Sequence, residues 1–468
     1  MACGNDGCAR TRSIQICVVQ LLLGLVGVTL TSPGWASDPA FEPFRWNEDY
    51  RYLSAKSTVS AYERLKYRPL NVGDQDGHLS FGGSVRSRAN LFDNDRFGLQ
   101  GGSDGAVWLQ RFYGHADIYV GERFRVFVEL SSHLADGSNQ LQPGPFDRDD
   151  AALSQAFVDW RFGGSRLRLG RQEVGLGSAR LMSARDGPNV RLSYDGLRLD
   201  HTFGDTQLLG FYLREVEVRQ GVFDNSSRSD DSIWGVNGTW APGRGHVDVY
   251  YLGLKRKDSV YVQGEEDEIR HSVGTRLFGS VGGWDWNLEA LYQFGNFGDS
   301  DIRAWTMASI VGYRFANVRW QPRLALSANV ASGDDDADDR RLGTFNPINP
   351  NLNYFEEAAI LAPQNFFNIE PEISWVITPR LGMALDWNFF WRLEENDAVY
   401  VRGLNPLPGT ADVKGHRVAH TPSISIDYQW SRQIKLDLSY SHFFARTVIR
   451  NAHGKDISFL KLQMQWTF

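Results

Sequence analysis

Apolar and polar residues alternate along most of the chain, most clearly at its end. In residues 457–468, ISFLKLQMQWTF, every second side chain counted back from Phe468 is apolar. Side chains of a strand point alternately to its two faces, so this segment predicts a strand with one apolar and one polar face. Such a strand ending on an aromatic residue is typical of the closing strand of an outer-membrane β-barrel, where it pairs with the first strand and removes the free sheet edge. The alternative is an edge strand of a soluble β-sandwich.

Comparable segments follow one another from Leu79 onwards. Residues 284–294 and 381–391 are among the clearest, with an apolar residue at every second position and mostly polar or small residues between. About eighteen such segments can be counted, an even number as expected of a bacterial barrel, although Thr206–Arg219 can be phased either way. The predicted fold class is therefore all-β, a transmembrane antiparallel β-barrel whose lumen is wide enough for an aqueous channel.

The connections between these segments alternate between short and long. Short turns are predicted at residues 163–165, 204–205, 242–245, 317, 378–379 and 431–432. Long polar connections are predicted at residues 136–152, 174–193, 220–231, 258–268, 332–367, 394–416 and 446–455. Short periplasmic turns and long extracellular loops are what an outer-membrane barrel requires, whereas a soluble sandwich has no reason to alternate in this way.

The first residues have the pattern of an export signal. Arg10 and Arg12 precede an apolar stretch at residues 14–30, and Gly34-Trp35-Ala36 supplies small residues for cleavage. Residues 1–36 are therefore expected to be a signal peptide, with a membrane anchor as the alternative. The sequence contains three cysteines, all within this leader, which excludes disulfides and thiol chemistry from the mature chain.

Composition narrows the remaining classes. After the leader no run of about 18 apolar residues occurs, so no membrane-spanning helix is expected. The formal net charge of −7 argues against nucleic acid as a partner, since that backbone needs a basic surface. The expected partners are membrane lipid and lipopolysaccharide, and the expected location is the bacterial outer membrane, with the barrel as a monomer.

Two regions follow the leader. Residues 37–78 lack the alternation and are expected to form a periplasmic N-terminal arm near the barrel mouth, with one short helical turn before Pro69. A flexible terminus is the alternative. Residues 79–468 are expected to form the barrel itself.

Arginine is frequent on the polar faces of the predicted strands, and acidic residues share these faces in smaller number. In a confined aqueous lumen, guanidinium groups attract anions and offer paired donors to carboxylates and phosphates. The alternative is that they pair with lumen carboxylates and fill space. The predicted solute path comprises Arg86, Arg88, Arg111, Arg123, Arg125, Arg161, Arg166, Arg168, Arg171, Arg185, Arg191, Arg198, Arg314, Arg323, Arg380 and Arg392, and Arg276 and Arg417 have the same phase.

A glycine-rich segment at residues 170–199 interrupts the alternation. It is too irregular to contact lipid, so it must lie inside the lumen or outside the membrane. Its charged residues could build a constriction or a plug contact, with an ordinary surface loop as the alternative. These residues are Arg171, Glu173, Arg180, Arg185, Asp186 and Arg191.

Three stretches carry a family resemblance. AYERLKYRPL at residues 61–70, GRQEVGLGSARLMSARDGPNVRLSYDGLRL at residues 170–199 and the terminal aromatic strand resemble the alginate-export family of outer-membrane barrels. The GRQE, GPNVR and DGLRL blocks are the most specific part. The resemblance implies an 18-stranded barrel with an electropositive, arginine-rich lumen that passes an anionic polyuronate, and loops that occlude each end.

The longest predicted loop contains an acidic run. Carboxylate oxygens are suitable ligands for Ca²⁺, but the spacing does not match an EF-hand loop. A solvated loop, or a lid that folds onto lumen arginines, is the preferred interpretation, and no other cofactor is expected. The weak metal candidates are Asp334, Asp335, Asp336, Asp338 and Asp339.

These observations predict a channel for an anionic solute. Export of an alginate-like acidic polysaccharide, with periplasmic secretion partners, is the first hypothesis. A selective uptake porin for small organic anions is the second. No catalysis is expected, because the histidines are scattered and Ser441 and His442 face opposite sides of one strand, although an outer-membrane hydrolase is kept as a third hypothesis.

Overall fold

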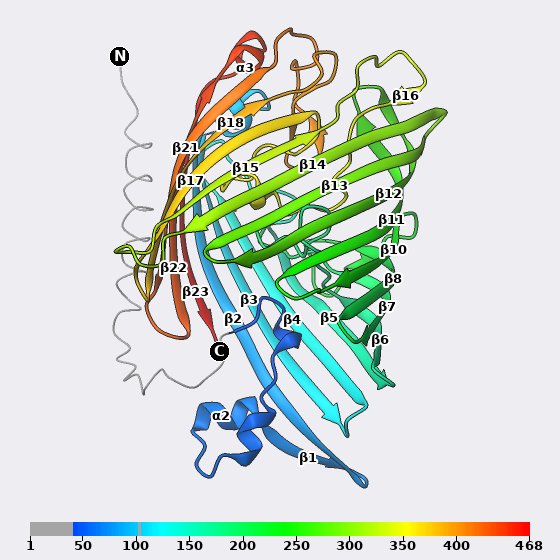
Figure 1. Ribbon diagram of the computed structural model, residues 1–468, viewed down its shortest axis with the longest axis vertical. Helices are drawn as coiled ribbons and strands as arrows, with labels where there is room; N and C mark the ends of the chain where they lie inside the picture. Colours follow the sequence, from blue (N-terminus) through cyan, green and yellow to red (C-terminus); the bar gives the residue numbers. More distant parts are fainter. Residues whose placement is uncertain (1–40, 102–103) are drawn as a thin grey trace, which may run out of the picture. The chain divides into compact units, whose positions relative to one another are not determined.

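The computed structural model describes residues 41–101 and 104–468 (Figure 1). The predicted signal peptide and the three cysteines lie outside the described residues. Among the residues described, no helix is long and apolar enough to cross a membrane. Within the same residues the barrel strands are β2 (Gln75–Asp93), β3 (Gly105–Val120), β4 (Phe124–Gly137), β5 (Asp149–Phe162), β6 (Ser165–Gln172), β7 (Tyr194–Phe203), β8 (Thr206–Glu217), β10 (Ser232–Trp240), β11 (Gly245–Tyr261), β12 (Gly264–Val281), β13 (Trp284–Phe297), β14 (Ser300–Arg314), β15 (Arg323–Ala331), β17 (Phe366–Thr378), β18 (Leu381–Trp391), β21 (Arg417–Gln429), β22 (Ile434–Ala445) and β23 (Ile457–Thr467).

Shorter elements decorate the two ends of the barrel. Figure 1 shows α2 and β1 at one end and α3 at the other. The N-terminal elements are η2 (Arg45–Asn47), η3 (Arg51–Ala55), α2 (Ala61–Lys66) and β1 (Arg68–Val72). The loop elements are η4 (Asp95–Gly98), β9 (Ser226–Ser227), β16 (Arg341–Leu342), η5 (Leu352–Tyr354), β19 (Tyr400–Val401), β20 (Asn405–Pro406) and α3 (Thr447–Asn451).

The prediction of an antiparallel barrel of about eighteen strands is confirmed. The sheet closes where β23 pairs with β2, in a register that runs from Ser84 opposite Thr467 to Asp93 opposite Ser458. Phe468 completes the seam, since its amide and carbonyl exchange hydrogen bonds of 3.0 and 2.9 Å with Gly83. Among the described strands, closure of the barrel leaves no free sheet edge, which is the condition for a sheet in a membrane.

The two faces of each strand differ as the alternation predicts. Large apolar side chains are exposed on the outside, and Leu169 and Val249 are each 63% exposed. Arg86 and Arg168, which point to the lumen, are fully buried. The ambiguous phase of Thr206–Arg219 in the sequence is explained by β8. Phe211 is buried on the inward side of this strand, so both of its faces are apolar.

Two of the predicted connections are wrong. The expected long loop at residues 258–268 is mostly strand, because β11 extends to Tyr261 and β12 begins at Gly264. At the start of β12 both faces of the strand carry polar residues, so the sequence shows no alternation of apolar and polar positions there. On the opposite side, the turn expected at Asn317 spans residues 315–322. A tight turn at residues 298–299 also joins two strands at the long-loop end.

Loops from the long-loop end fill that half of the barrel. Phe345 and Ile360 of the loop at residues 332–365, Tyr400 of the loop at residues 392–416 and Ile449 of α3 are each no more than 3% exposed. They join one continuous apolar core with inward side chains of the strands. The lumen is therefore closed by packed side chains at this end, and its open space lies toward the short turns.

Candidate functional site: the barrel lumen

Arginines line the inner face of β2 to β7, which we call the basic wall. Strand register brings Arg86 opposite Arg111 and Arg168 opposite Arg198. The antiparallel pairing places both members of each pair on the same face, because they stand directly across from each other. The wall thus has an upper group near the long loops and a lower group near the short turns.

The upper group surrounds an aspartate of residues 173–193, which we call the inner loop. Nη2 of Arg111 lies 2.8 Å from Oδ1 of Asp186, and Nη1 of Arg86 lies 3.6 Å from Oδ2. Arg86 also donates to the Asp186 carbonyl at 2.8 Å, and Arg88 donates to the carbonyl of Gly187. Enclosure alone would raise the pKa of Asp186, but Arg111, Arg86 and the nearby Arg191 hold this pKa well below its usual range.

The inner loop is anchored within the barrel rather than over it. Asn189 donates to the carbonyls of Gln110 and Leu134, each at 3.1 Å, and these belong to two neighbouring wall strands. Arg191 forms an ion pair of 2.9 Å with Glu173 across the base of the loop. Burial raises the pKa of Glu173, and the positive charge of Arg191 opposes this shift.

Residues 41–66, a part of the N-terminal arm expected at residues 37–78, cover the lower group. From here on we use the word arm for residues 41–66 alone. The ring of Trp46 lies 3.9 Å from the Arg168 guanidinium carbon, and the Trp46 carbonyl accepts from Arg125 at 2.6 Å. Arg45 donates to the carbonyls of Gly83 and Phe468 at 2.9 and 3.0 Å, which fixes the arm to the barrel seam. The arm therefore packs inside the mouth that the short turns surround.

The lower arginines are paired with carboxylates of adjacent strands. Arg125 binds Asp117 at 2.6 Å, and Arg168 binds Asp159 at 2.7 Å. Asp200 is shared by two further arginines of the wall. Most of the lower group is thus neutralised locally, as the space-filling alternative anticipates. The two arginines that share Asp200 are Arg166 at 3.0 Å and Arg198 at 2.6 Å.

The arm and the inner loop meet inside the lumen. Arg191 donates to the Pro43 carbonyl at 3.3 Å, and its guanidinium carbon lies 5.7 Å from the centre of the Phe44 ring. A segment from each end of the barrel therefore contributes to one obstruction in front of the basic wall.

Several predicted path residues lie elsewhere. Arg171 shares the outward face of Leu169 and pairs with Asp195 at 2.8 Å, so it does not face the lumen. Arg392 is 1% exposed and donates to loop carbonyls, including that of Gly415 at 2.7 Å. It fixes an extracellular loop rather than lining a passage.

The remaining predicted arginines are scattered. Arg123 and Arg380 lie in short turns, and Arg314 donates to a carbonyl of another turn at 3.1 Å. Arg161 lies over the Tyr119 ring at 5.6 Å. The other two make contacts that the sequence does not indicate. Arg185 donates to Asn349 at 2.5 Å, and Arg323 pairs with Asp285 at 2.6 Å and Glu372 at 3.2 Å.

Opposite chemistry occupies another part of the lumen, which we call the acidic wall. Glu372 stands across from Asp386 on β17 and β18, and Asp427 stands across from Asp437 on β21 and β22. Glu370 lies two residues before Glu372 and so has the same face. Each of these positions alternates with outward apolar residues, so the sequence indicates the face of each carboxylate but not their clustering.

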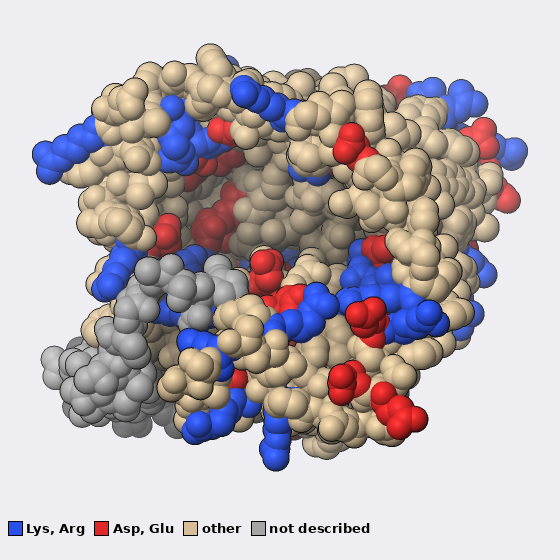
Figure 2. All heavy atoms as spheres, turned by 60° about the horizontal axis from the view of Figure 1, so that its bottom comes forward, with Lys and Arg blue, Asp and Glu red and all other residues tan. Residues whose placement is uncertain are grey.

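A deep hollow opens at the end that carries the short turns. Figure 2 brings this end forward and shows acidic atoms on the wall of the hollow, with basic atoms around it. The Glu372 side chain is 36% exposed, in contrast to the fully buried Arg86. Carboxylates of the acidic wall therefore contact the solvent-filled part of the lumen.

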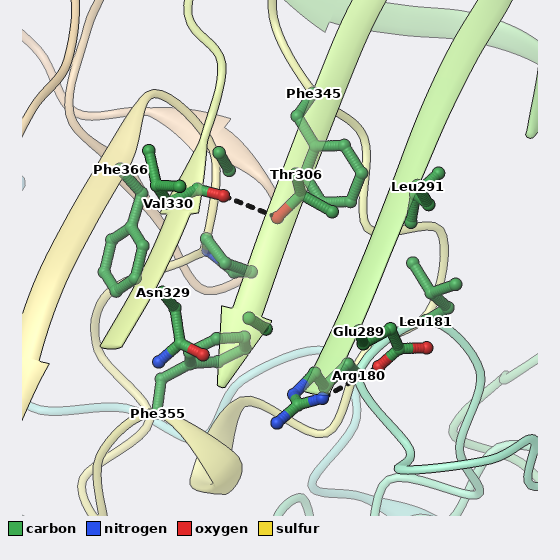
Figure 3. A pocket seen from close by; sticks show the side chains of 13 residues that line it. Arg180, Leu181, Glu289, Leu291, Thr306, Asn329, Val330, Phe345, Phe355 and Phe366 are labelled. Carbon is green, nitrogen blue, oxygen red and sulfur yellow. Dashed lines mark hydrogen bonds and ion pairs between the residues drawn. The ribbon is translucent and has the colours of Figure 1, made fainter. Parts of the chain in front are cut away.

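A small cavity lies where the inner loop and the loop at residues 332–365 meet strands β13 to β15 (Figure 3). Its volume is about 20 Å³, enough for a single water molecule. Arg180 of the inner loop pairs with Glu289 at 2.9 Å beside Phe355 of the other loop. The ion pair fixes the inner loop to β13, and the Arg180 guanidinium carbon also lies 4.3 Å from the centre of the Tyr354 ring in the other loop. The cavity is too confined to be a solute site.

The acidic run at residues 334–339 does not gather around one point. Asp334 is buried and accepts from the Gly343 amide at 2.9 Å, whereas Asp335 pairs with Arg341 at 3.0 Å. Throughout the described ranges, no cluster of three or more His, Cys, Asp or Glu side chains is placed to hold a metal ion. The candidates Asp334, Asp335, Asp336, Asp338 and Asp339 therefore do not converge on one point, and their positions do not support the calcium site considered from the sequence.

Comparison with known proteins decides the family. The family model for alginate export matches residues 78–462. The chain belongs to the alginate export family. A search of curated proteins finds no significant match. The family and the barrel together identify an outer-membrane barrel of the channel-forming kind, in agreement with the resemblance noted in the sequence.

Solved structures share the fold at low sequence identity. OccAB1 of Acinetobacter baumannii matches with a TM-score of 0.58 and 14% identity, over 87% of this chain and 99% of that chain. OccD3 (OpdP) of Pseudomonas aeruginosa matches with a TM-score of 0.57 and 11% identity, over 86% and 93%. Likeness at these identities establishes the barrel alone.

Proposed function

We propose that this member of the alginate export family is a channel through which an acidic polysaccharide leaves the cell, along the basic wall. The observation that carries the proposal is the position of Asp186. One carboxylate contacts Arg111 and Arg86 at 2.8 and 3.6 Å in the middle of the lumen. A uronate carboxylate presents the same group, and guanidinium forks bind it with two parallel donors.

In the proposed mechanism the inner loop occupies the wall when no solute is present. While the lumen is closed, the wall arginines donate to the Asp186 carboxylate and to loop carbonyls, whereas Nε of Arg86 and Nε and Nη1 of Arg111 have no protein partner in the described part of the chain. An arriving chain of carboxylates and hydroxyls replaces these acceptors one for one. No covalent step is involved, because many weak sites share the desolvation of the solute.

A second function, uptake of small organic anions, is favoured by the narrowness of the path. The arm and the inner loop meet at Arg191, which leaves the basic wall covered. A small carboxylate needs less displacement of these segments than a polymer does.

Planar-bilayer recordings of the purified protein test the proposal. Reversal potentials are measured under a salt gradient before and after adding oligouronate or a small dicarboxylate. We expect oligouronate to block the current and Arg111→Ser to weaken the block, whereas the exposed Arg148→Ser serves as the control. Block by the small dicarboxylate alone would transfer the conclusion to the uptake function, and absence of block by either anion would refute the anion path.

A further inference from the structure

The outward face of β18, β21 and β22 contains a groove near the long-loop end. Its volume is about 1010 Å³, at the upper end of the range of about 300–1,000 Å³ for pockets that hold small ligands. The groove lies beside α3, which Figure 1 shows at the end opposite α2 and β1. It is separate from the lumen and plays no part in the proposed transport path.

Aromatic rings form the floor of this groove. The rings of Trp387 and Phe389 stack at 5.8 Å, and those of Phe389 and Trp391 at 6.3 Å. His420 joins them from the next strand and stacks on Phe444 at 4.8 Å. Trp387 remains 46% exposed. Such a belt is typical of the membrane–water interface, where one side of a ring meets acyl chains and the other meets headgroups.

Arginines form the upper rim of the groove. Arg417, Arg446 and Arg450 all line it, and all are exposed. Arg450 pairs with Asp456 at 2.5 Å. This placement corrects the expectation that Arg417 faces the lumen. Arg417 pairs with Trp391, and the register between β18 and β21 shifts between Phe390 and Trp391. The alternation of inward and outward side chains is therefore interrupted just before Arg417.

We propose that this groove binds lipid A of lipopolysaccharide, with a sugar phosphate at the arginine rim and acyl chains on the aromatic floor. The long loops of an outer-membrane barrel face the outside, where the outer leaflet lies. Guanidinium groups match phosphate oxygens with two parallel donors. Apolar rings below a basic rim therefore complement a molecule that carries phosphate directly above several acyl chains.

Native mass spectrometry of the full chain in detergent tests this assignment. Bisphosphorylated lipid A is titrated, and the bound fraction gives an apparent dissociation constant. We expect Arg417→Ser with Arg446→Ser to weaken lipid A binding about tenfold or more. The control is Arg303→Ser with Arg340→Ser, which removes two exposed arginines at the same end of the barrel but outside the groove.

Three further measurements sharpen the result. Lipid A that lacks its phosphates should bind the unchanged protein about as weakly as bisphosphorylated lipid A binds the double variant. Heat-dependent migration on gels verifies that each variant remains a folded barrel. Equal lipid A binding by the groove variant and the unchanged protein would overturn the proposal, as would binding of phosphatidylglycerol as tight as that of lipid A.

Discussion

Replacing Asp186 by Asn tests how the inner loop controls the basic wall. The substitution keeps the size of the side chain and removes one negative charge that lies 2.8 Å from Arg111 and 3.8 Å from Arg191. The barrel encloses Asp186 on all sides, but 58% of its side-chain surface is open to solvent within the lumen. We therefore expect Asp186→Asn to increase anion selectivity and to tighten the block by oligouronate.

The size of the effect follows from Coulomb's law. A solute carboxylate about 8 Å from the removed charge is relieved of about 0.5 kcal/mol of repulsion in water, and of about 2 kcal/mol at an effective dielectric constant of about 20. These values correspond to a block that is about twofold to thirtyfold tighter. High salt should reduce the gain, because the Debye length falls to about 3 Å at 1 M.

Single-channel recording measures this change directly. The block constant for oligouronate and the reversal potential are compared between the unchanged protein, Asp186→Asn and Asp150→Asn. Asp150 is a suitable control because it forms an ion pair with Arg148 at the exposed rim, at 3.1 Å. If Asp186→Asn shifts neither quantity, the upper arginines do not lie on the ion path.

Three more substitutions test other parts of the lumen. Trp46→Ala should release the arm and raise the conductance, because a buried Trp lost from a packed site costs about 3–5 kcal/mol, whereas the exposed Leu65→Ala should not. Burial raises the pKa of Asp334 to about 7, so its stabilising contribution is complete below its unfolded pKa and is lost as pH rises through about 7. Protease cleavage of the loop at residues 332–365 should accordingly increase between about pH 4 and pH 7, and Asp334→Asn should abolish that dependence. Glu372→Gln should move the reversal potential toward anion selectivity, and an unchanged potential would show that the acidic wall lies off the path.

The faces of the strands were predictable because a membrane barrel separates lipid from water at every second residue. Leu169 and Arg168 therefore take the sides that the alternation predicts. The same parity places Arg171 outside with Leu169, once β6 is known to continue to Gln172. The glycine-rich pattern that begins at Gly170 predicted that the strand ends there, whereas β6 continues to Gln172.

The partners of the arginines were not predictable from the sequence. Arg86 and Asp186 are 100 residues apart and meet only because the inner loop folds back into the barrel. That fold depends on long-range contacts such as those of Asn189 with two wall strands, and alternation contains no information about them. Arg417 illustrates a second limit, since a single register shift reverses the face of a residue.

The two walls of the lumen lead to a further consequence for selectivity. In the closed arrangement Arg86, Arg88 and Arg111 are buried behind the inner loop, so their positive charges are not exposed to the hollow. The acidic wall contains Glu372, which remains partly exposed. Withdrawal of the inner loop removes Asp186 from the lumen but leaves Arg86 and Arg111 in place on their strands. We infer that the closed barrel favours cations and the open barrel favours anions, so selectivity should change together with conductance. A polyanion that displaces the loop would thus create the positive path through which it moves.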